Sequence, residues 1–505
     1  MRVDVRPVSR LRGKDPVDVI AALAPVLDAL CAGDLDLSRL TVVCDWIQYR
    51  SNFREVADYR PILAQAADHA FRADPGENHD SERPGSPETG LEMAIDLRRC
   101  ADADLRSVVA GLLREHDRPE TSARVPLGPW TPGRQSCIWG FNALYWQALS
   151  LWEQATGRDY EQALPGGESD ARNTASVREL ILELFKTWDD LDARSALPPE
   201  LYVVELGVGN GNQARTWLDE FVALSQAHSR DYYRRLHYIM GDYSPHVLGR
   251  ALKAVAHHGD HVSALVVDAT HPAVSLGFLR GKAFLVYISN VYDNLPSDEV
   301  ARIGGRTYQV ETQAYLPGSD AQRIAQQCSA PPGRICELVD KLLRLGPELL
   351  CEAMPQHFKD AAQAVTFWRD VWAALRLRER YRPLEGFDLY QVTPDLNGEL
   401  LRSQLESYGD IRIHVNNGAL SSFAETLPLL HPFGRLQCHD LFLDDVRRYQ
   451  SGFFGPGKYD GSVVNWVNGP LLRHIGGRAG FDVRILPFAA RPSSNVKTLT
   501  AGVRE

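Results

Sequence analysis

The stretch VVELGVGNGNQ, residues 203–213, decides the fold because it joins a short apolar strand to a glycine turn and then to a helix. Glycines stand at positions 207, 209 and 211. A residue without a Cβ accepts positive φ and lets a ligand approach the backbone closely. The helix after the turn presents free N–H groups and partial positive charge. In a Rossmann-like sheet this crevice binds a nucleotide-like ligand, so the stretch predicts such a sheet and such a ligand.

The residues around this stretch alternate between short apolar strands and helices, which indicates a parallel sheet covered on both faces. We expect strands at 201–206, 237–241, 262–267 and 283–289, and helices at 213–227 and 245–257. The alternation resumes with strands at 411–415 and 435–441. The last two strands, 481–488 and 495–503, read as a hairpin. The predicted fold class is therefore α/β, a mostly parallel sheet with an antiparallel last strand.

The glycine spacing separates two kinds of cofactor. A dinucleotide site has the pattern G-x-G-x-x-G. This chain instead has E-x-G-x-G-x-G, from Glu205 to Gly211, which is typical of class I methyltransferases. The sequence therefore predicts S-adenosylmethionine as the cofactor.

Three successive strands end in an acid, which supports that cofactor. Glu205 can hold an ammonium group directly or through water, and Asp242 can accept both hydroxyls of a ribose. Asp242 also precedes a helix start, where an acid has a purely structural use. Asp268 ends the third strand at a position that often contacts the adenine amino group in this fold. The full predicted cofactor set is Glu205, Gly207, Gly209, Gly211, Asn212, Asp242, Tyr243, Asp268, Ala269 and Ser289.

The fourth strand runs into the polar segment NVYDNLP, residues 290–296. Polar groups at the carboxyl end of this strand would face the methyl donor, where they can orient a nucleophile and accept its proton. The alternative is a polar turn with its own local hydrogen bonds.

The order of these motifs resembles the MidA family, which includes the mitochondrial complex I assembly methyltransferase. The resemblance rests on ELGVGNG at 205–211, DYSP at 242–245, SNVYDNLP at 289–296, HDLF at 439–442 and DGSVVNW at 460–466. It spans about residues 137–488 and implies a class I methyltransferase. The candidates around the methyl acceptor are Asn290, Tyr292, Asp293, His439 and Asp440.

Among these candidates we expect Asp293 to orient the acceptor or take its proton, with His439 as the second choice of base or as a structural histidine. Members of the MidA family have been taken to methylate protein arginine, and paired carboxylates suit a guanidinium. This chain has Asn290 where the family pattern has Glu. A protein side chain, arginine among them, and a small molecule both stay open as acceptors.

The composition narrows the partners. The net charge of −10 gives no basic balance for nucleic-acid binding. The eight cysteines are scattered without a CxxC pair, so we expect reduced, mostly buried thiols and no metal site. No run of about 18 apolar residues occurs, so we expect no membrane span and a cytoplasmic protein. A homodimer stays open.

The domain expectation is a mainly helical N-terminal extension, 1–124, with a mobile loop at 73–90, followed by the methyltransferase domain, 125–505. A helical insertion at about 297–400 and the aromatic segment 139–152 would form a lid. The predicted function is an S-adenosylmethionine-dependent methyltransferase. The alternatives are a non-catalytic cofactor-binding assembly or scaffold protein and, against the glycine spacing, a nucleotide-dependent oxidoreductase.

Overall fold

The computed structural model describes residues 1–504 apart from 7–18, 34–35, 48, 50, 65–87, 101–102, 118–122 and 161–173. The chain folds into two compact units, each assembled from separate stretches. The first unit contains Met1–Phe141, Ser297–Val415 and Val446–Asn465, and the second contains Asn142–Pro296, Asn416–Asp445 and Trp466–Glu505. The expected boundary at 124/125 does not coincide with this division, because residues 297–415 pack with the N-terminal segment.

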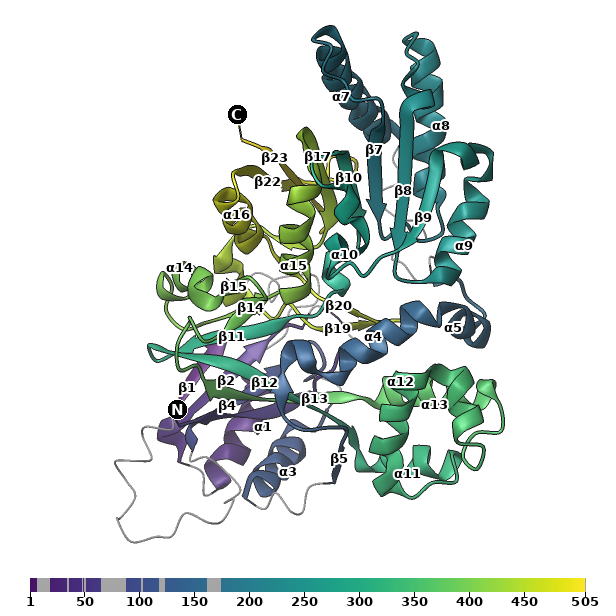
Figure 1. The fold of residues 1–505 in the computed structure, drawn as a ribbon. Coiled ribbons are helices and arrows are strands. Elements are labelled where there is room, and N and C mark those ends of the chain that lie inside the picture. The colour runs from purple at the N-terminus through teal and green to yellow at the C-terminus, as the bar shows by residue number, and fades with distance from the viewer. Residues whose placement is uncertain are drawn as a thin grey trace. The chain divides into compact units, whose positions relative to one another are not determined.

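The second unit is built on a seven-stranded sheet with the order β22-β23-β17-β10-β7-β8-β9 (Figure 1). The strands are β7 (Leu201–Leu206), β8 (Leu236–Asp242), β9 (Val262–Val266), β10 (Ala283–Ser289), β17 (Leu430–Asp440), β22 (Phe481–Pro487) and β23 (Lys497–Val503). The pairs from β17 to β9 are parallel, and β23 is antiparallel to both of its neighbours. This is the mostly parallel sheet with an antiparallel last strand that the sequence predicts.

Helices cover both faces of this sheet. They are α7 (Thr174–Ala193), α8 (Asn212–Ala227), α9 (Pro245–Ala254), α10 (Pro272–Leu276), α15 (Asn417–Thr426) and α16 (Gly469–Arg478). Helices α4 (Cys137–Gln147) and α5 (Leu149–Thr156) precede them in the chain, and α4 runs across the unit boundary. Helices α7 and α8 lie side by side in Figure 1, and their apolar faces share one core with β7, β8 and β10. Trp188, Trp217, Phe221 and Phe284 are almost fully buried in that core. Large aromatic side chains therefore fix the helix that follows the glycine turn against the sheet.

The first unit is built on a ten-stranded mixed sheet, so the expectation of a mainly helical N-terminal extension is wrong. Its strands are β1 (Arg2–Val5), β2 (Leu40–Asp45), β3 (Ala57–Leu63), β4 (Glu88–Asp96), β5 (Arg124–Pro126), β6 (Thr131–Pro132), β11 (Asp298–Ile303), β12 (Arg306–Pro317), β13 (Arg376–Pro383) and β16 (Ile411–Val415). Only α1 (Val19–Ala32) and α3 (Leu105–Asp117) are helices of the extension among the described residues. The apolar run at 91–95 belongs to a buried strand, and a short run of this kind does not distinguish a strand from a helix. Most of the expected mobile loop lies outside the described residues, and 88–90 begin β4.

The insertion after residue 297 is also less helical than expected. It contains α11 (Gly318–Gln327), α12 (Ile335–Ala353) and α13 (Ala361–Ala374), but its strands β11, β12 and β13 form antiparallel pairs at the centre of the first sheet. The strand at 411–415, expected in the methyltransferase sheet, pairs with β11 instead. Of these four strands the sequence predicts only the one at 411–415, and its partner β11 comes from the stretch expected to be helical.

The short elements are β14 (Gln391–Thr393), β15 (Leu396–Asn397), α14 (Arg402–Glu406), β18 (Phe442–Leu443), β19 (Gly457–Tyr459), β20 (Ser462–Val464) and β21 (Val467–Asn468). All eight cysteines lie in the described part of the chain as free thiols, four of them buried, and Cys31 is exposed. Among the described residues, no helix is both long and apolar enough to cross a bilayer.

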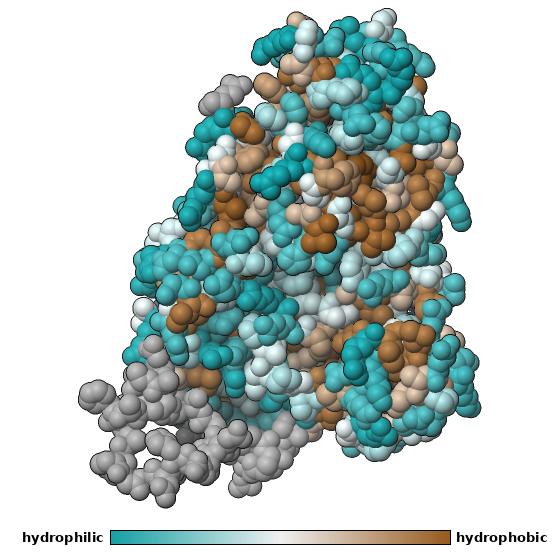
Figure 2. Space-filling view, in the orientation of Figure 1, coloured by the Kyte–Doolittle hydropathy of each residue, from teal (hydrophilic) through white to brown (hydrophobic). Residues whose placement is uncertain are grey.

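Exposed apolar side chains gather on the β9 side of the second sheet. Leu252, Val266, Val274 and Phe278 are exposed to between 43% and 86%. Figure 2 shows hydrophobic residues on the surface over β8, β9 and α9, among otherwise largely hydrophilic areas. Strand β9, which carries Val266, is the last strand of the sheet on this side.

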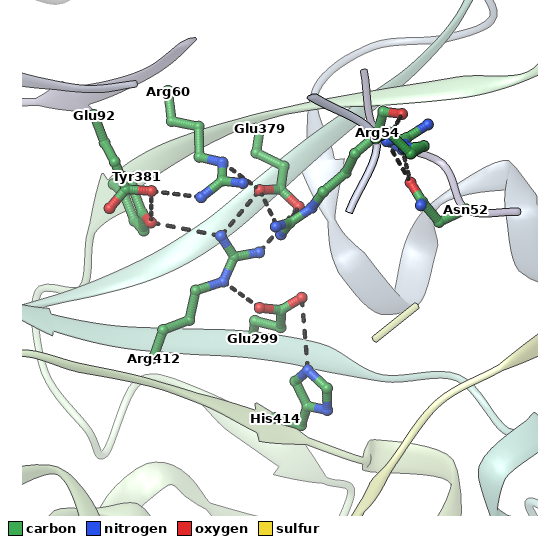
Figure 3. Close-up of polar contacts among 10 residues, drawn as sticks. Asn52, Arg54, Arg60, Glu92, Glu299, Glu379, Tyr381, Arg412 and His414 are labelled. Carbon is green, nitrogen blue, oxygen red and sulfur yellow. Dashed lines mark hydrogen bonds and ion pairs between the residues drawn. The ribbon is translucent and has the colours of Figure 1, made fainter. Parts of the chain in front are cut away.

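A buried group of charged side chains holds the first sheet together (Figure 3). Glu379 on β13 accepts from Arg54 at 2.9 Å, Arg60 at 2.8 Å and Arg412 at 2.9 Å. Although burial alone would raise the pKa of Glu379, Arg412, Arg54 and Arg60 hold it well below its ordinary value. Removing one member of such a group leaves uncompensated buried charge, which costs about 3–5 kcal/mol.

Two further carboxylates complete this charged group. Glu92 on β4 accepts from Arg60 at 2.5 Å and from the Tyr381 hydroxyl at 2.8 Å. Glu299 on β11 pairs with Arg412. The group thereby joins the N-terminal segment to residues of β13 that lie 289 to 325 positions later in the chain.

Candidate cofactor and active site

The glycine turn lies between the end of β7 and the start of α8. Gly207, Gly209 and Gly211 have φ of +75°, +58° and +80°. A Cβ on Gly207 would lie 2.3 Å from a methyl of Val291, and one on Gly211 would lie 2.6 Å from the Cα of Ala251. Each glycine is therefore required by positive φ, and two of them also by close approach of the next strand and helix.

The turn is tied to the neighbouring strand β8. The N–H groups of Gly207 and Val208 donate to the carbonyl of Gly241 at 2.8 and 3.2 Å. The Asn210 side chain accepts from the N–H of Asn212 at 3.0 Å, so one of the first free N–H groups of α8 is already capped within the turn. Asn212 is the first residue of α8, and its backbone N–H points to the Asn210 side chain within the glycine turn.

Glu205 lies buried at the end of β7. Its carboxyl group accepts a hydrogen bond from the Tyr238 hydroxyl at 2.5 Å. Burial raises the pKa of Glu205 to about 8; the Tyr238 hydrogen bond opposes this, and the charge of Asp242 adds to it. A carboxyl group whose pKa is raised this far by its surroundings is typical of a functional site, because a cationic partner would restore its charge.

Asp242 ends β8 beside the turn. Its two carboxylate oxygens accept from the N–H of Gly209 at 3.2 Å and of Ser244 at 3.1 Å. Burial raises the pKa of Asp242, and these backbone donors, with that of Tyr243, oppose the shift. Each oxygen keeps a second lone pair, so a diol can still bind both. The N-cap of α9 is Ser244, whose hydroxyl accepts from the N–H of Val247 at 3.3 Å, so Asp242 supports the helix start only through its bond to the N–H of Ser244.

Asp268 follows β9 and is exposed. It accepts from the N–H of Thr270 at 2.8 Å and from its hydroxyl at 2.6 Å, which closes a local turn around Ala269. Tyr243 is half-exposed, and its hydroxyl accepts from the Gln147 amide at 2.9 Å. Burial raises the pKa of Tyr243, with Asp268 as the next cause, so these two residues face the same region.

The end of β10 meets the end of β17. Ser289 pairs with His439 in the parallel register, and the N–H of Asn290 donates to the His439 carbonyl at 2.9 Å. Asn290 itself has a φ of +52°, an uncommon conformation for a residue with a side chain. Backbone strain of this kind is often found at functional sites.

Asp440 accepts hydrogen bonds from the backbone N–H groups of the segment after β10. One of its oxygens accepts from the N–H of Tyr292 at 2.8 Å, of Val291 at 3.2 Å and of Asp293 at 3.4 Å, and the other accepts from Leu441 at 2.7 Å. Burial raises the pKa of Asp440 to about 6, and these donors oppose the shift. The donors favour the charged form, so Asp440 is the ionised partner of the nearby Asp293.

Asp293 is buried beside this charge. Burial, and next the charge of Asp440, raise the pKa of Asp293 well above its ordinary value, while the Asn294 amide, which donates at 2.7 Å, opposes the shift. Two adjacent carboxyl groups of this kind share one proton. The shifts favour the proton on Asp293, and a protonated carboxyl group is suited to orienting an acceptor rather than to removing its proton.

Tyr292 and His439 lie deeper than an acceptor-binding group would. Tyr292 is fully buried. His439 is 3% exposed, and its two ring nitrogens lie 2.9 Å from the Thr498 hydroxyl and 3.1 Å from the Gln437 amide. Burial lowers the pKa of His439 to about 4, so it is neutral at physiological pH. The geometry fits the structural alternative for His439.

Sequence reasoning missed the residues that cover the turn. The Tyr160 hydroxyl accepts from the N–H of Asn210 at 3.2 Å, and a Cβ on Gly209 would lie 2.5 Å from it. The Tyr160 ring packs edge-on against Trp146 of α4. Tyr160, which covers the turn, thus lies outside the two segments expected to form a lid, 139–152 and 297–400, although Trp146 of the first segment packs against it. The sequence around Tyr160 is polar and gave no signal beyond the aromatic residue itself.

The strand order puts all of these groups in one row. Asp440, Asn290, Gly207, Asp242 and Asp268 follow the carboxyl ends of β17, β10, β7, β8 and β9, which are neighbours in that order. In an open α/β sheet, ligands bind outside the carboxyl ends of the strands. The row has a buried acid and a glycine turn at its centre and a carboxyl pair beside them.

Comparisons with known proteins locate similar folds. No protein-family model and no curated protein matches the chain. A COG1565 superfamily member from Burkholderia thailandensis, solved with bound S-adenosyl-homocysteine, is 12% identical over 78% of this chain and 92% of its own, with a TM-score of 0.42. A second COG1565 superfamily protein from the same species is 12% identical over 78% and 91%, with a TM-score of 0.38.

A third similar structure, the CurJ carbon methyltransferase, is 11% identical over 71% of this chain and 66% of its own, with a TM-score of 0.28. The COG1565 superfamily is MidA-like, so the solved structures include the group of proteins that the sequence motifs resemble. At these identities and TM-scores the likeness by itself assigns neither a family nor a reaction to this chain.

Proposed function

We propose that this chain is an S-adenosylmethionine-dependent methyltransferase of class I. The observation that carries the proposal is the row of strand ends, in which a three-glycine turn is flanked by Glu205, Asp242 and Asp268 on three adjacent parallel strands. The glycines leave room for the amino-acid tail of the cofactor, Glu205 faces its ammonium group, and Asp242 receives its ribose hydroxyls. Asp268 with Ala269 and Tyr243 forms the adenine end, and Ser289 lies at the methyl side.

The cofactor supplies a methyl group on a sulfonium, which is transferred in line to a nucleophile. The protein therefore needs to hold the acceptor and guide its proton away. Asn290 and protonated Asp293 are placed to orient the acceptor through hydrogen bonds, and Asp440 fixes their backbone. With no ionised base among these three beyond the already occupied Asp440, the acceptor would lose its proton to solvent or arrive as a strong nucleophile.

The acceptor is a protein side chain, arginine among the choices, or a small molecule. Arginine is the less favoured protein acceptor, because a guanidinium is best held by paired carboxylates and this chain has the neutral Asn290 beside Asp293. The same neutrality keeps one alternative in place: a non-catalytic assembly or scaffold protein that binds the cofactor. We place the protein in the cytoplasm, without a nucleic-acid partner, and a homodimer is compatible with the proposal.

Calorimetric titration with S-adenosylmethionine, S-adenosyl-homocysteine and NADH tests the class. We expect micromolar binding of the two sulfur compounds only, lost on Asp242→Ala. Asp482→Ala, which removes an exposed acid on β22 of the same sheet, is the matched control and should bind as the wild type does. Loss of binding in both variants, or binding of NADH alone, would overturn the proposal.

Turnover separates the enzyme from the scaffold. Cofactor labelled in the methyl group is incubated with the protein and with an extract divided into protein and small-molecule fractions. Transfer of label to one fraction identifies the acceptor class. If Asp293→Ala still binds the cofactor but no longer transfers label, the result supports catalysis. Tight cofactor binding with no transfer to either fraction supports the scaffold.

A further inference from the structure

A second cluster of ligand-type side chains lies in the second unit, at the amino end of β9, whereas the cofactor row lies at the carboxyl ends of the strands. Asp219 belongs to α8, and His257 and His258 belong to the 3-10 turn η6 (Ala256–His261) just before β9. The Asp219 carboxylate lies 2.8 Å from Nε2 of His257 and 3.0 Å from Nε2 of His258. The three ligand atoms all lie within 4.8 Å of one another.

The surroundings hold one imidazole in the orientation that a metal ligand needs. Nδ1 of His258 lies 2.7 Å from the Tyr233 hydroxyl, and the His258 ring is 5% exposed. A partner on one ring nitrogen fixes the tautomer and directs the other nitrogen to the ion, as in most protein metal sites. Asp219 and His257 are 52% and 55% exposed, so the remaining coordination positions are open to water.

We propose that Asp219, His257 and His258 bind one divalent transition-metal ion, with Zn²⁺ as the best fit. Two imidazoles and one carboxylate suit zinc, which binds such a set in tetrahedral geometry with water as the fourth ligand. Oxygen-seeking Mg²⁺ and Ca²⁺ are disfavoured, because two of the three donors are nitrogens. The sequence analysis considered only cysteines as metal ligands. It missed this cluster, in which two adjacent histidines meet an acid that is distant in the sequence.

The site would act on structure rather than on methyl transfer. The ion would join α8, whose first turn follows the glycine motif, to the segment that leads into β9, whose far end carries Asp268. Metal binding would therefore brace the two elements that position the cofactor pocket. The proposal stands independently of the proposed function, since it requires neither the cofactor nor turnover.

The competing explanation is a pair of imidazoles that hydrogen-bond to one carboxylate without a metal ion. Metal titration of the full chain after chelator treatment distinguishes the two. We expect one Zn²⁺ per chain, with affinity at least tenfold weaker in His257→Ala and in Asp219→Asn. His474→Ala, which removes an exposed histidine on α16, is the matched control and should leave the affinity unchanged.

Cobalt substitution shows whether the metal binds at this cluster or at one of the eight free thiols, because thiols also bind zinc. We expect the Co²⁺ spectrum to show nitrogen and oxygen ligands, without the intense thiolate charge-transfer band. The melting temperature of the wild type should rise with Zn²⁺, and that of His257→Ala should not. A thiolate spectrum, no binding, or equal binding in all variants would overturn the proposal.

Discussion

Cofactor affinity should depend on pH through a single carboxyl group, Glu205. Burial raises the pKa of Glu205 to about 8, from an ordinary 4.5, so near pH 7 the side chain is mostly neutral in the free protein. Pairing with the ammonium group of the cofactor requires the ionised form, and binding therefore releases a proton. A group that must ionise changes affinity up to tenfold per pH unit below its pKa, so affinity should rise roughly twentyfold between pH 6 and pH 7.5.

The same shift has a defined sign in stability. Because the pKa of Glu205 is raised in the folded protein, its contribution to the free energy of unfolding is fully present below pH 4.5 and is lost as the pH rises toward about 8. Cofactor binding opposes this loss. Stability with the cofactor should therefore fall less with pH than stability without it.

Titration calorimetry in two buffers of different ionisation enthalpy measures the proton release directly. The matched variant is Glu205→Gln, which keeps the shape of the side chain and an acceptor for the Tyr238 hydroxyl but cannot ionise. It should bind more weakly and with little dependence on pH. An affinity that is flat with pH in the wild type, or a slope unchanged in Glu205→Gln, would refute the reasoning.

Three further changes test other parts of the molecule. Asp242→Asn should weaken S-adenosyl-homocysteine binding roughly tenfold to a hundredfold by calorimetry, because it removes the charge-assisted acceptor for a diol. Gly211→Ala should lower the free energy of unfolding by more than about 3 kcal/mol in urea melts, since its Cβ would lie 2.6 Å from backbone. Gly281→Ala, also at positive φ but with no atom within 4 Å, should cost only about 1 kcal/mol, and equal losses would contradict the role of close packing. Glu379→Ala should destabilise by about 3–5 kcal/mol in the same melts, and Glu399→Ala, at an exposed ion pair, by no measurable amount.

The second sheet could be predicted from the sequence because each of these strands has a recognisable local sequence pattern. β7 and β10 have the expected limits, β8 is one residue longer than expected at each end, and β9 ends one residue earlier than expected. Each is an apolar run that ends at glycine or a polar residue, which is the pattern of a strand buried on both faces. The candidate cofactor residues lie at or near those same ends, so the sequence proposes them together with the strands.

The first sheet could not be predicted in the same way. Strand β13 has the sequence RLRERYRP, which reads as exposed, yet it lies at the centre of the sheet. Its Glu379 is buried because it meets arginines that are distant in sequence, such as Arg60. Tyr160, 50 residues before its partner Asn210, was missed for a similar reason. Long-range pairing leaves no periodic pattern for a local reading to detect.

The division of the chain into two units has a practical consequence for dissecting the protein. The backbone passes from one unit to the other after residues 141, 296, 415, 445 and 465. No single cut yields either unit whole, so a library of terminal truncations would report on broken sheets rather than on separable domains. Exchanging the first unit between related proteins would mean replacing three segments at once, while circular permutants opened at one of these passages offer a simpler way to test which unit folds first.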